Sequence, residues 1–127
     1  MKKEFISPKG VYNDPSYSHA VKVGNIVYVA GQVGEDEEGK TVEGGFEAQA
    51  LKAFENMKVV LEAAGAGFKD VVKLNGFFAN YLRDRSKYHE IRSRFFSPPL
   101  PIATNVQVAF TAFPEILLEV EAVAVID

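Results

Sequence analysis

The chain has 127 residues, of which 47% are hydrophobic and 24% charged, and its formal net charge is −3. This length supports a single domain over residues 1–127 with a core of its own, and it is too short for two domains. The acidic balance argues against a nucleic-acid partner, since a phosphate-binding surface is normally basic, and the absence of cysteine excludes disulfides, thiolate metal sites and a cysteine nucleophile.

The chain begins with the polar stretch Met1–Glu4, and no long apolar run follows it. A signal peptide and a membrane-spanning helix both need such a run, so we expect a cytoplasmic protein with no membrane partner. Residues 1–17 contain prolines and polar side chains, which predict an arm with one short strand at most.

The apolar pattern predicts strands and helices in the rest of the chain. The expected elements are a hairpin, a helix, a strand, a second helix and two final strands, at residues 20–23 with 26–30, 46–64, 71–79, 84–96, 104–110 and 116–126. Gly65 suits the left-handed position just after the first helix. The acidic, glycine-rich segment 35–45 is expected to be a solvated loop. Residues 97–101 hold three prolines and should form a stiff connector, because proline lacks a backbone donor.

Local signals mark the ends of several elements. Gly24-Asn25 is typical of a two-residue hairpin turn. We expect Gly31 and Gly34 to end the strand that follows this turn. Either Asp84 or Ser86 should cap the second helix, because both side chains can accept a hydrogen bond from the first turn.

The order ββαβαββ predicts an α+β fold, in which one sheet is covered on one face by two helices. The other face would be left open, and we expect apolar side chains to point outward there, among them Val27, Val29, Phe77 and Val123. An apolar patch of that kind is normally buried by another subunit. We therefore expect a symmetric oligomer.

Glu121 is the sharpest candidate for chemistry. It lies among valines and alanines, and strand alternation puts it on one face with Glu119 and Val123. Burial raises the cost of ionising a carboxylate unless a partner compensates, which is how carboxylates transfer protons near neutral pH. The alternative is a glutamate on an edge strand facing water, a description that also fits Glu119. The pattern alone favours neither interpretation for Glu121.

Two further clusters carry polar residues. His19 follows Ser18, but adjacent residues on an extended chain point to opposite sides, so a catalytic pair is not expected. His89 and Arg92 share one face of the second predicted helix, where they could bind an anion. We favour a solvated face or an intersubunit contact for this pair. The two histidines lack metal-binding spacing and no phosphate-binding loop is present, so we expect neither a metal nor a cofactor.

Several segments together resemble the RidA/YjgF family. They occur in the family's order and at its spacing, at residues 17–25, 27–32, 45–50, 56–65, 70–73 and 119–125. The resemblance implies the YjgF-like fold, which is similar to that of chorismate mutase, assembled as a homotrimer. It also implies three small-molecule sites in the clefts between subunits. Archetypal members hydrolyse 2-imino or 2-enamino acids to 2-keto acids and ammonia.

The resemblance implies that part of the ligand site is retained. Glu121 matches the family glutamate that positions or activates water. Tyr17 matches the pocket tyrosine, and Gly31 matches the glycine whose backbone borders the ligand. These matches favour an enzyme.

The same resemblance identifies substitutions in the site. Ala103 stands where the imine-deaminating members have the arginine that holds the substrate carboxylate. Losing such a pair costs a few kcal/mol, on the order of a hundredfold in rate, so we do not expect efficient hydrolysis of 2-imino acids. His19, His89 and Asn105 replace a glutamine, an asparagine, and a cysteine or valine. Either Arg92 or His19 restores the anion site, or the ligand carries no carboxylate near position 103.

Two functions therefore remain open from the sequence. The first is hydrolysis of an imine, an enamine or a related C–N bond, with Glu121 activating water and Tyr17, Gly31 and His19 orienting the ligand. The second is a non-catalytic small-molecule-binding or regulatory trimer, which the loss of the arginine favours. Ribonuclease activity, a label attached to some members of the family, is the least favoured because the chain is acidic and lacks a two-histidine constellation.

Overall fold

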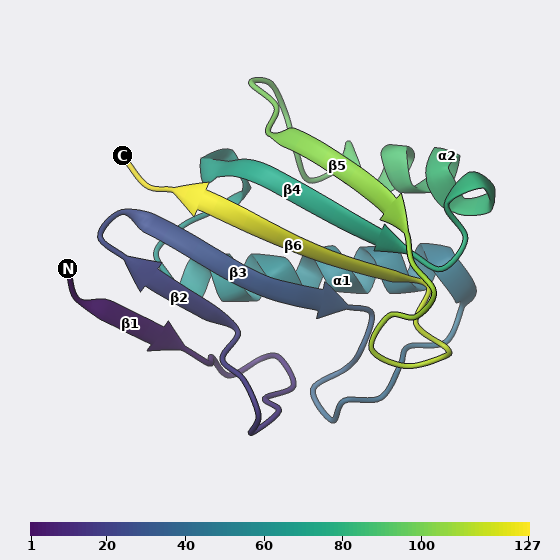
Figure 1. Cartoon of the computed structure of the whole chain (residues 1–127), viewed down its shortest axis with the longest axis horizontal. Helices are drawn as coiled ribbons and strands as arrows, with labels where there is room; N and C mark the ends of the chain where they lie inside the picture. Colours follow the sequence, from purple (N-terminus) through teal and green to yellow (C-terminus); the bar gives the residue numbers. More distant parts are fainter.

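Strands and helices follow one another in the predicted order (Figure 1). The computed structural model describes residues 1–127. Its elements are β1 Lys3–Ile6, β2 Ala20–Val23, β3 Ile26–Val33, α1 Gly45–Ala63, the short 3₁₀ helix η1 Phe68–Asp70, β4 Val71–Phe78, α2 Tyr81–Arg92, β5 Ile102–Gln107 and β6 Leu118–Val125. The expected α+β fold is confirmed, and β1 is the short strand allowed for in the arm.

The strands form one six-stranded sheet in the order β1-β2-β3-β6-β4-β5. Neighbouring strands are antiparallel except β4 and β5, which run parallel and are connected through α2. The last strand of the chain, β6, therefore lies between β3 and β4 in the interior of the sheet. This position is important for the site because β6 carries both Glu119 and Glu121.

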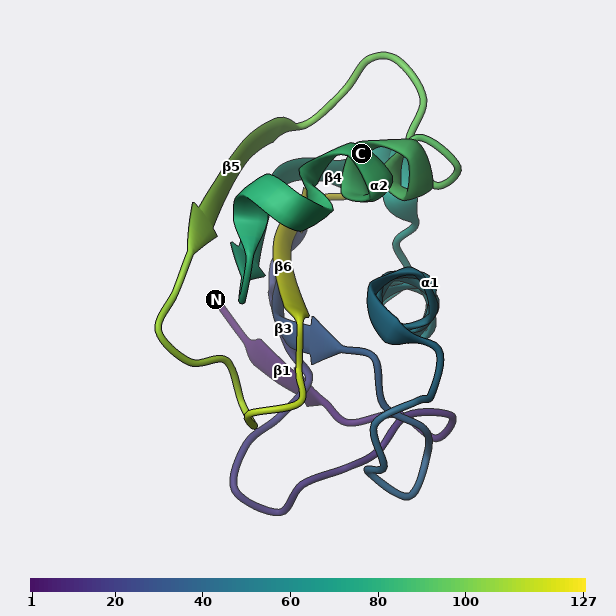
Figure 2. The ribbon, with the colours of Figure 1, turned by 90° about the vertical axis from the view of Figure 1, so that its right-hand side faces the viewer.

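The helices pack on one face of this sheet. α1 lies against β3 and β6, and α2 packs beside α1. In Figure 2, α1 lies inside the arc that β3 and β6 form. No helix combines the length and the apolar character that crossing a membrane requires.

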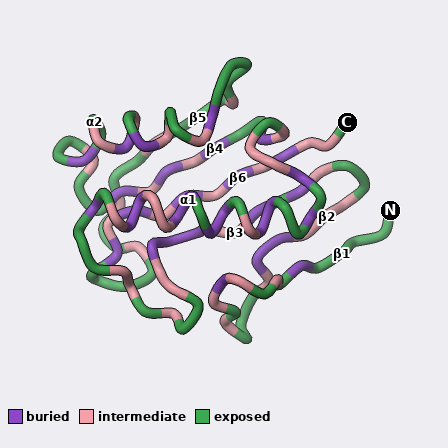
Figure 3. The backbone as a smooth tube through the Cα atoms, turned by 180° about the vertical axis from the view of Figure 1, so that it is seen from behind, coloured by how far each residue is buried: buried purple, intermediate pink, exposed green.

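The core fills the space between α1 and the sheet. Apolar residues recur at helical spacing along α1, and they bury one face of the helix, at Ala50, Ala53, Phe54, Met57, Val60 and Leu61. Alternate residues of β6 are buried against this face, at Leu118, Val120, Ala122 and Ala124. Figure 3 shows the buried stretches along α1 and the central strands, and the greater exposure of β1 at the rim.

The prediction that Val27 and Val29 point away from the helices is wrong. Both side chains are buried in the core, at 0% and 4% exposure. Their partners across the β3–β6 pair are Ala124 and Ala122, which also face α1, and residues directly opposite in an antiparallel pair share a face. Tyr28, which lies between the two valines, is 50% exposed on the open face.

Phe77 and Val123 do lie on the open face, as expected, and both are half-buried. On β6, Val123 alternates with the buried Ala122 and Ala124, so its side chain points away from the helices. On β4, Phe77 alternates in the same way with the buried Phe78. The open face is therefore less apolar than the sequence indicated.

Several predicted boundaries shift in the structure. β3 continues through Gly31 as far as Val33, with an irregular register between Val29 and Gln32. The first helix is followed by Gly65 at φ +82°, which confirms its left-handed position. The second helix ends at Arg92 rather than near residue 96.

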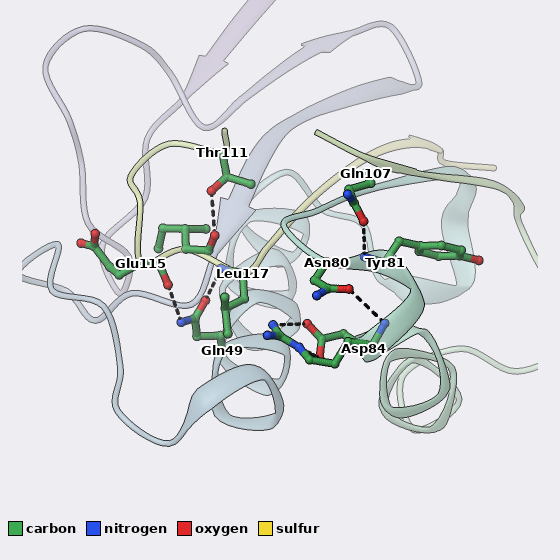
Figure 4. Close-up of polar contacts among 10 residues, drawn as sticks. Gln49, Asn80, Tyr81, Asp84, Gln107, Thr111, Glu115 and Leu117 are labelled. Atoms are coloured by element: carbon green, nitrogen blue, oxygen red, sulfur yellow. Dashed lines mark hydrogen bonds and ion pairs between the residues drawn. The ribbon is translucent and has the colours of Figure 1, made fainter. Parts of the chain in front are cut away.

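The predicted cap of α2 is also wrong. The helix begins at Tyr81, and the side chain of Asn80 accepts a hydrogen bond from the backbone N–H of Arg83 (3.1 Å; Figure 4). Gln107 of β5 accepts a hydrogen bond from the N–H of Tyr81 (3.0 Å), so strand and helix meet at this end. Asp84 lies inside the helix and pairs with the Arg83 guanidinium instead.

The predicted strand at 104–110 is displaced toward the N-terminus. β5 begins at Ile102, directly after the proline-rich connector, and ends at Gln107. Residues 108–117 form an irregular loop that returns the chain to the centre of the sheet. This loop contributes residues to the candidate site.

Candidate functional site

A cavity of about 760 Å³ opens on the face of the sheet that the helices leave uncovered. Its walls come from the arm before β2, the end of β3 with the following loop, the end of β4, the loop after β5 and the start of β6. Segments far apart in the sequence meet here because β6 returns between β3 and β4.

Three of the predicted site residues line this cavity together. Tyr17 comes from the arm, Gly31 from β3 and Glu121 from β6. The structure thus brings together the three positions that match retained family residues. Their roles toward a ligand stay predictions.

Glu121 is held by a neighbour on the adjacent strand. Asn75 of β4 is its register partner, and the Asn75 side-chain amide donates a hydrogen bond to Glu121 Oε1 (3.2 Å). This hydrogen bond fixes the orientation of the carboxylate. The second carboxylate oxygen makes no hydrogen bond within the chain, so it is available to a water molecule or a ligand.

Glu119 does not match the description of an edge glutamate facing water. β6 is an interior strand, and the Glu119 side chain is half-buried and lines the same cavity as Glu121. Its pKa is raised from the usual value, mainly by burial and next by the charge of Glu121. The sequence contained the signal, because two glutamates two residues apart on a strand must share a face.

The position of Gly31 has a steric explanation. A Cβ built on Gly31 would collide with the carboxyl group of Glu119, which lies across this stretch of β3. The absent side chain therefore leaves room for the second carboxylate of the site.

Acidic groups surround Tyr17 as well. Burial raises the pKa of the Tyr17 hydroxyl, and the charges of Glu35 and Asp14 add to this effect. The pKa of Glu35 is raised by burial and then by the neighbouring charges of Asp36, Asp14 and Glu119. Glu35 was predicted to be part of a solvated loop, but it is half-buried and lines the cavity. Its contact with the site depends on loop conformation, which the composition of the loop could not indicate.

The loop after β5 is fixed by a buried glutamine of α1. The side chain of Gln49 donates a hydrogen bond to the Glu115 carbonyl (2.9 Å) and accepts one from the Leu117 N–H (2.8 Å; Figure 4). The hydroxyl of Thr111 donates to the Ile116 carbonyl (2.9 Å) within the same loop. These hydrogen bonds position the loop 108–117, in which Phe110 and its neighbours line the cavity.

His19 lies outside the cavity wall. It is 3% exposed, and its Nε2 donates to the Tyr12 carbonyl at 2.6 Å. Its Nδ1 accepts from the Gln32 side-chain amide at 3.0 Å, which fixes the tautomer. Both ring nitrogens are thus used to tie the arm to β3, and a contact of His19 with a ligand stays a prediction.

The other predicted residues gather elsewhere, around α2 and β5. Arg92 donates to His89 Nδ1 (3.1 Å), and its guanidinium lies 5.5 Å from the ring centroid of Tyr88. Burial lowers the pKa of His89, and the charges of Arg92 and Arg85 lower it further. The cavity near Glu121 contains none of these side chains.

Ala103 and Asn105 of β5 belong to this second group. They pair with Leu74 and Gly76 of β4, both buried on the helix side, so their side chains point toward the helices. Asn105 Oδ1 is buried without a hydrogen-bond partner. It lies 2.7 Å from where a Cβ on Gly76 would be, so this glycine makes room for it.

Tyr88 presents a second buried polar atom beside the same glycine. Its hydroxyl has no hydrogen-bond partner and would be 3.4 Å from a Cβ on Gly76. Burial raises the pKa of Tyr88 to about 12, so the hydroxyl stays protonated. Within one chain, the predicted site residues are therefore divided between two separate regions. No group of three or more His, Cys, Asp or Glu side chains is arranged to hold a metal ion.

A family model described as endoribonuclease L-PSP matches residues 11–126. The chain belongs to this family, the RidA/YjgF family. It is similar to the 2-iminobutanoate/2-iminopropanoate deaminase of Dermatophagoides farinae, with 37% identity over 131 residues, 96% of this chain and 100% of that protein. The human protein of the same name is 38% identical over 111 residues, which cover 86% of this chain and 79% of that protein.

Solved structures of RidA/YjgF proteins share the fold. RidA from the Antarctic bacterium Psychrobacter sp. PAMC 21119 superposes with a TM-score of 0.90 and 38% identity, and the match covers 97% of this chain and 99% of that one. The six-stranded sheet and two helices are therefore a RidA/YjgF fold, as the resemblance implied.

Proposed function

We propose that the chain forms a homotrimer with small-molecule sites in its intersubunit clefts, where it hydrolyses an imine, an enamine or a related C–N bond. The observation that carries this proposal is the carboxylate of Glu121, oriented by Asn75 inside the cavity beside Tyr17 and Gly31. Relatives over most of the chain are named as imine deaminases, which supports the same reaction type.

In the proposed reaction, water adds to the carbon of a protonated imine. Glu121 accepts a proton from the attacking water, and the product of addition is a carbinolamine. The nitrogen gains a proton and leaves, so that R₂C=NH₂⁺ and water become R₂C=O and NH₄⁺. Glu119 is suited to supply the proton to the leaving nitrogen, because its pKa is raised while it lies on the same face of β6.

Efficient hydrolysis of 2-imino acids is not part of this proposal. Ala103 offers neither charge nor hydrogen-bond donor to a substrate carboxylate. Arg92, the residue that could replace the lost charge, is bonded to His89 and lies over the Tyr88 ring on the helix side. The cavity of the same chain therefore has no donor suited to a carboxylate pair.

The exposed apolar side chains support the trimer. Ile102 and Val106 of β5 are exposed, as are Phe110 and Phe113 on the loop at the cavity. A neighbouring subunit would remove this surface from water and close the cavity at its rim. Light scattering after size-exclusion chromatography should give three times the 14.0 kDa mass of one chain.

The function is tested by measuring imine hydrolysis with substrates formed in place. An amino-acid oxidase supplies 2-imino acids, an amine oxidase supplies imines without a carboxylate, and semicarbazide traps what is not hydrolysed. We expect activity on the second class and little on the first. In the proposed trimer, β5 of a neighbouring subunit borders the cleft, so Ala103→Arg should gain activity on 2-imino acids. Efficient turnover of 2-imino acids by the wild type would show that the interpretation of Ala103 is wrong.

The second candidate is a non-catalytic binding or regulatory trimer, which Ala103 favours. Glu121→Gln separates the two, because it should abolish hydrolysis while leaving binding of an unreactive ligand intact. If the wild type accelerates no imine hydrolysis although it binds such ligands, the second candidate is the better description. Ribonuclease activity remains the least favoured, since the cavity has no basic side chain to hold a phosphate.

A further inference from the structure

We infer that the cavity is selective for a net cation, namely an ammonium or iminium group attached to an apolar or aromatic body that carries no carboxylate. This inference rests on the proposed function for the identity of the site and for the reaction that the ligand undergoes. The charges and the aromatic walls of the cavity support the selectivity itself.

The charged groups that one chain contributes to the cavity have one sign. Five of its lining residues are acidic, namely Asp14, Glu35, Glu38, Glu119 and Glu121, and no lysine, arginine or histidine lines it. Glu38 pairs with Lys40 at the exposed rim, whereas the other four form no ion pair. Lys73 lines a separate small hollow, which also includes Glu121.

The half-buried carboxylates repel one another. The pKa values of Glu35 and Glu119 are both raised, first by burial and then by neighbouring negative charges, and no positive charge offsets either shift. A bound cation would relieve this repulsion and lower both pKa values. A bound carboxylate would increase the repulsion and would also lose its own hydration.

Aromatic rings form much of the remaining wall. The rings that line the cavity are those of Tyr12, Tyr17, Phe77, Phe110 and Phe113. The face of an aromatic ring carries negative potential and attracts ammonium groups, while its carbon surface buries an apolar body. Rings and carboxylates in one cavity therefore favour the same class of ligand.

This selectivity agrees with the proposed reaction. A protonated imine is a cation in its own right, whereas a 2-imino acid also carries a carboxylate that would face the acidic wall. The substrate would arise from the dehydrogenation of an amine, in which a C–H and an N–H bond are converted to C=N. The product would be an uncharged aldehyde or ketone, which the acidic cavity would not retain.

The test is a binding titration of the full chain, measured by calorimetry. The three unreactive probes share a phenyl ring and differ in charge: benzylammonium, benzyl alcohol and phenylacetate. We expect benzylammonium to bind more tightly than benzyl alcohol and phenylacetate to show no binding. Benzylammonium should bind more weakly at high salt, because ions screen the carboxylates. Benzyl alcohol should show no such dependence.

Single substitutions test which carboxylates are responsible. Glu35→Gln and Glu119→Gln should each weaken benzylammonium binding about fivefold and leave benzyl alcohol unchanged. Glu37→Gln is the matched control, because it removes the same charge from the same loop at an exposed position outside the cavity wall. Circular dichroism checks that each variant is folded.

The outcomes separate this inference from the proposed function. Preference for phenylacetate, or equal effects of Glu35→Gln and Glu37→Gln on benzylammonium, would overturn the inference even if the protein hydrolyses imines. Selective binding of benzylammonium by a protein that accelerates no imine hydrolysis would support the inference and refute the proposed reaction.

Discussion

Gly31→Ala tests whether the position of the Glu119 carboxyl group controls the chemistry of the cavity. A Cβ at position 31 would lie 2.7 Å from Glu119 Cδ and 2.9 Å from its Cγ, so the glutamate must move. An ordinary contact between carbon atoms needs about 3.5 Å, which implies a displacement of about 1 Å. The obstructing atoms are the end of a flexible side chain, and Gly31 does not have a positive φ.

The expected effect on stability is therefore small and the expected effect on activity large. The free energy of unfolding should fall by about 1 kcal/mol or less, measured by urea denaturation. A displacement of about 1 Å within a reacting constellation costs on the order of a hundredfold in rate. kcat/KM for imine hydrolysis should fall in that proportion.

Gly34→Ala is the matched control on the same strand end. A Cβ there would lie 2.5 Å from the Cα of Gln49, in the backbone of α1, which cannot move alone. We expect this variant to lose about 2 kcal/mol or more. The reasoning would be refuted if Gly31→Ala were destabilised as strongly as Gly34→Ala, or if Gly31→Ala kept the kcat/KM of the wild type.

Three further predictions concern stability and the cavity loop. Phe54→Ala should lower the free energy of unfolding by about 3–5 kcal/mol in urea denaturation, because the ring is fully buried in the core; a loss below 1 kcal/mol would contradict this. Gln49→Ala should raise amide exchange in residues 108–117, which it holds by two hydrogen bonds, and unchanged exchange would contradict that role. Glu119→Gln should be more stable than the wild type at pH 7 but not at pH 4. Because the pKa of Glu119 is raised, its ionisation destabilises the folded protein as pH rises through that pKa. An equal gain in stability at both pH values would refute this prediction.

The order of elements could be predicted because it depends on local patterns. α1 repeats apolar residues at helical spacing over its whole length, and Gly65 marks its end. The bounds of α2 were harder to predict, because only Tyr88, Ile91 and Asp84 are buried. The start of this helix is fixed by Asn80 together with Gln107 of a distant strand. A cap that is completed by tertiary contacts leaves little signal in its own sequence.

The sequence of an apolar strand could not predict which of its side chains face the helices and which face the open side of the sheet. Val27, Tyr28 and Val29 are all compatible with either face, and only the pairing of β3 with β6 decides that the valines face α1. The same long-range pairing places β6 in the interior of the sheet and turns Glu119 from an expected surface residue into part of the cavity.

Site residues were predicted correctly where they match a family motif and lie on a strand or close to one. Tyr17, Gly31 and Glu121 are brought together, whereas His89 and Arg92 lie in a different region of the chain. The acidic groups of the arm and of the loop after β3 were missed, because a loop's composition does not reveal what it packs against.

The most direct test of the proposed function is hydrolysis of an imine without a carboxylate, formed in place from benzylamine, by the wild type and by Glu121→Gln. Each rate is corrected for spontaneous hydrolysis, and benzylammonium binding is measured for both proteins. We expect acceleration by the wild type and a loss of about a hundredfold or more in Glu121→Gln. Benzylammonium binding should weaken only about fivefold in this variant, as for the other cavity carboxylates. Equal rates for the two proteins would contradict the role of Glu121.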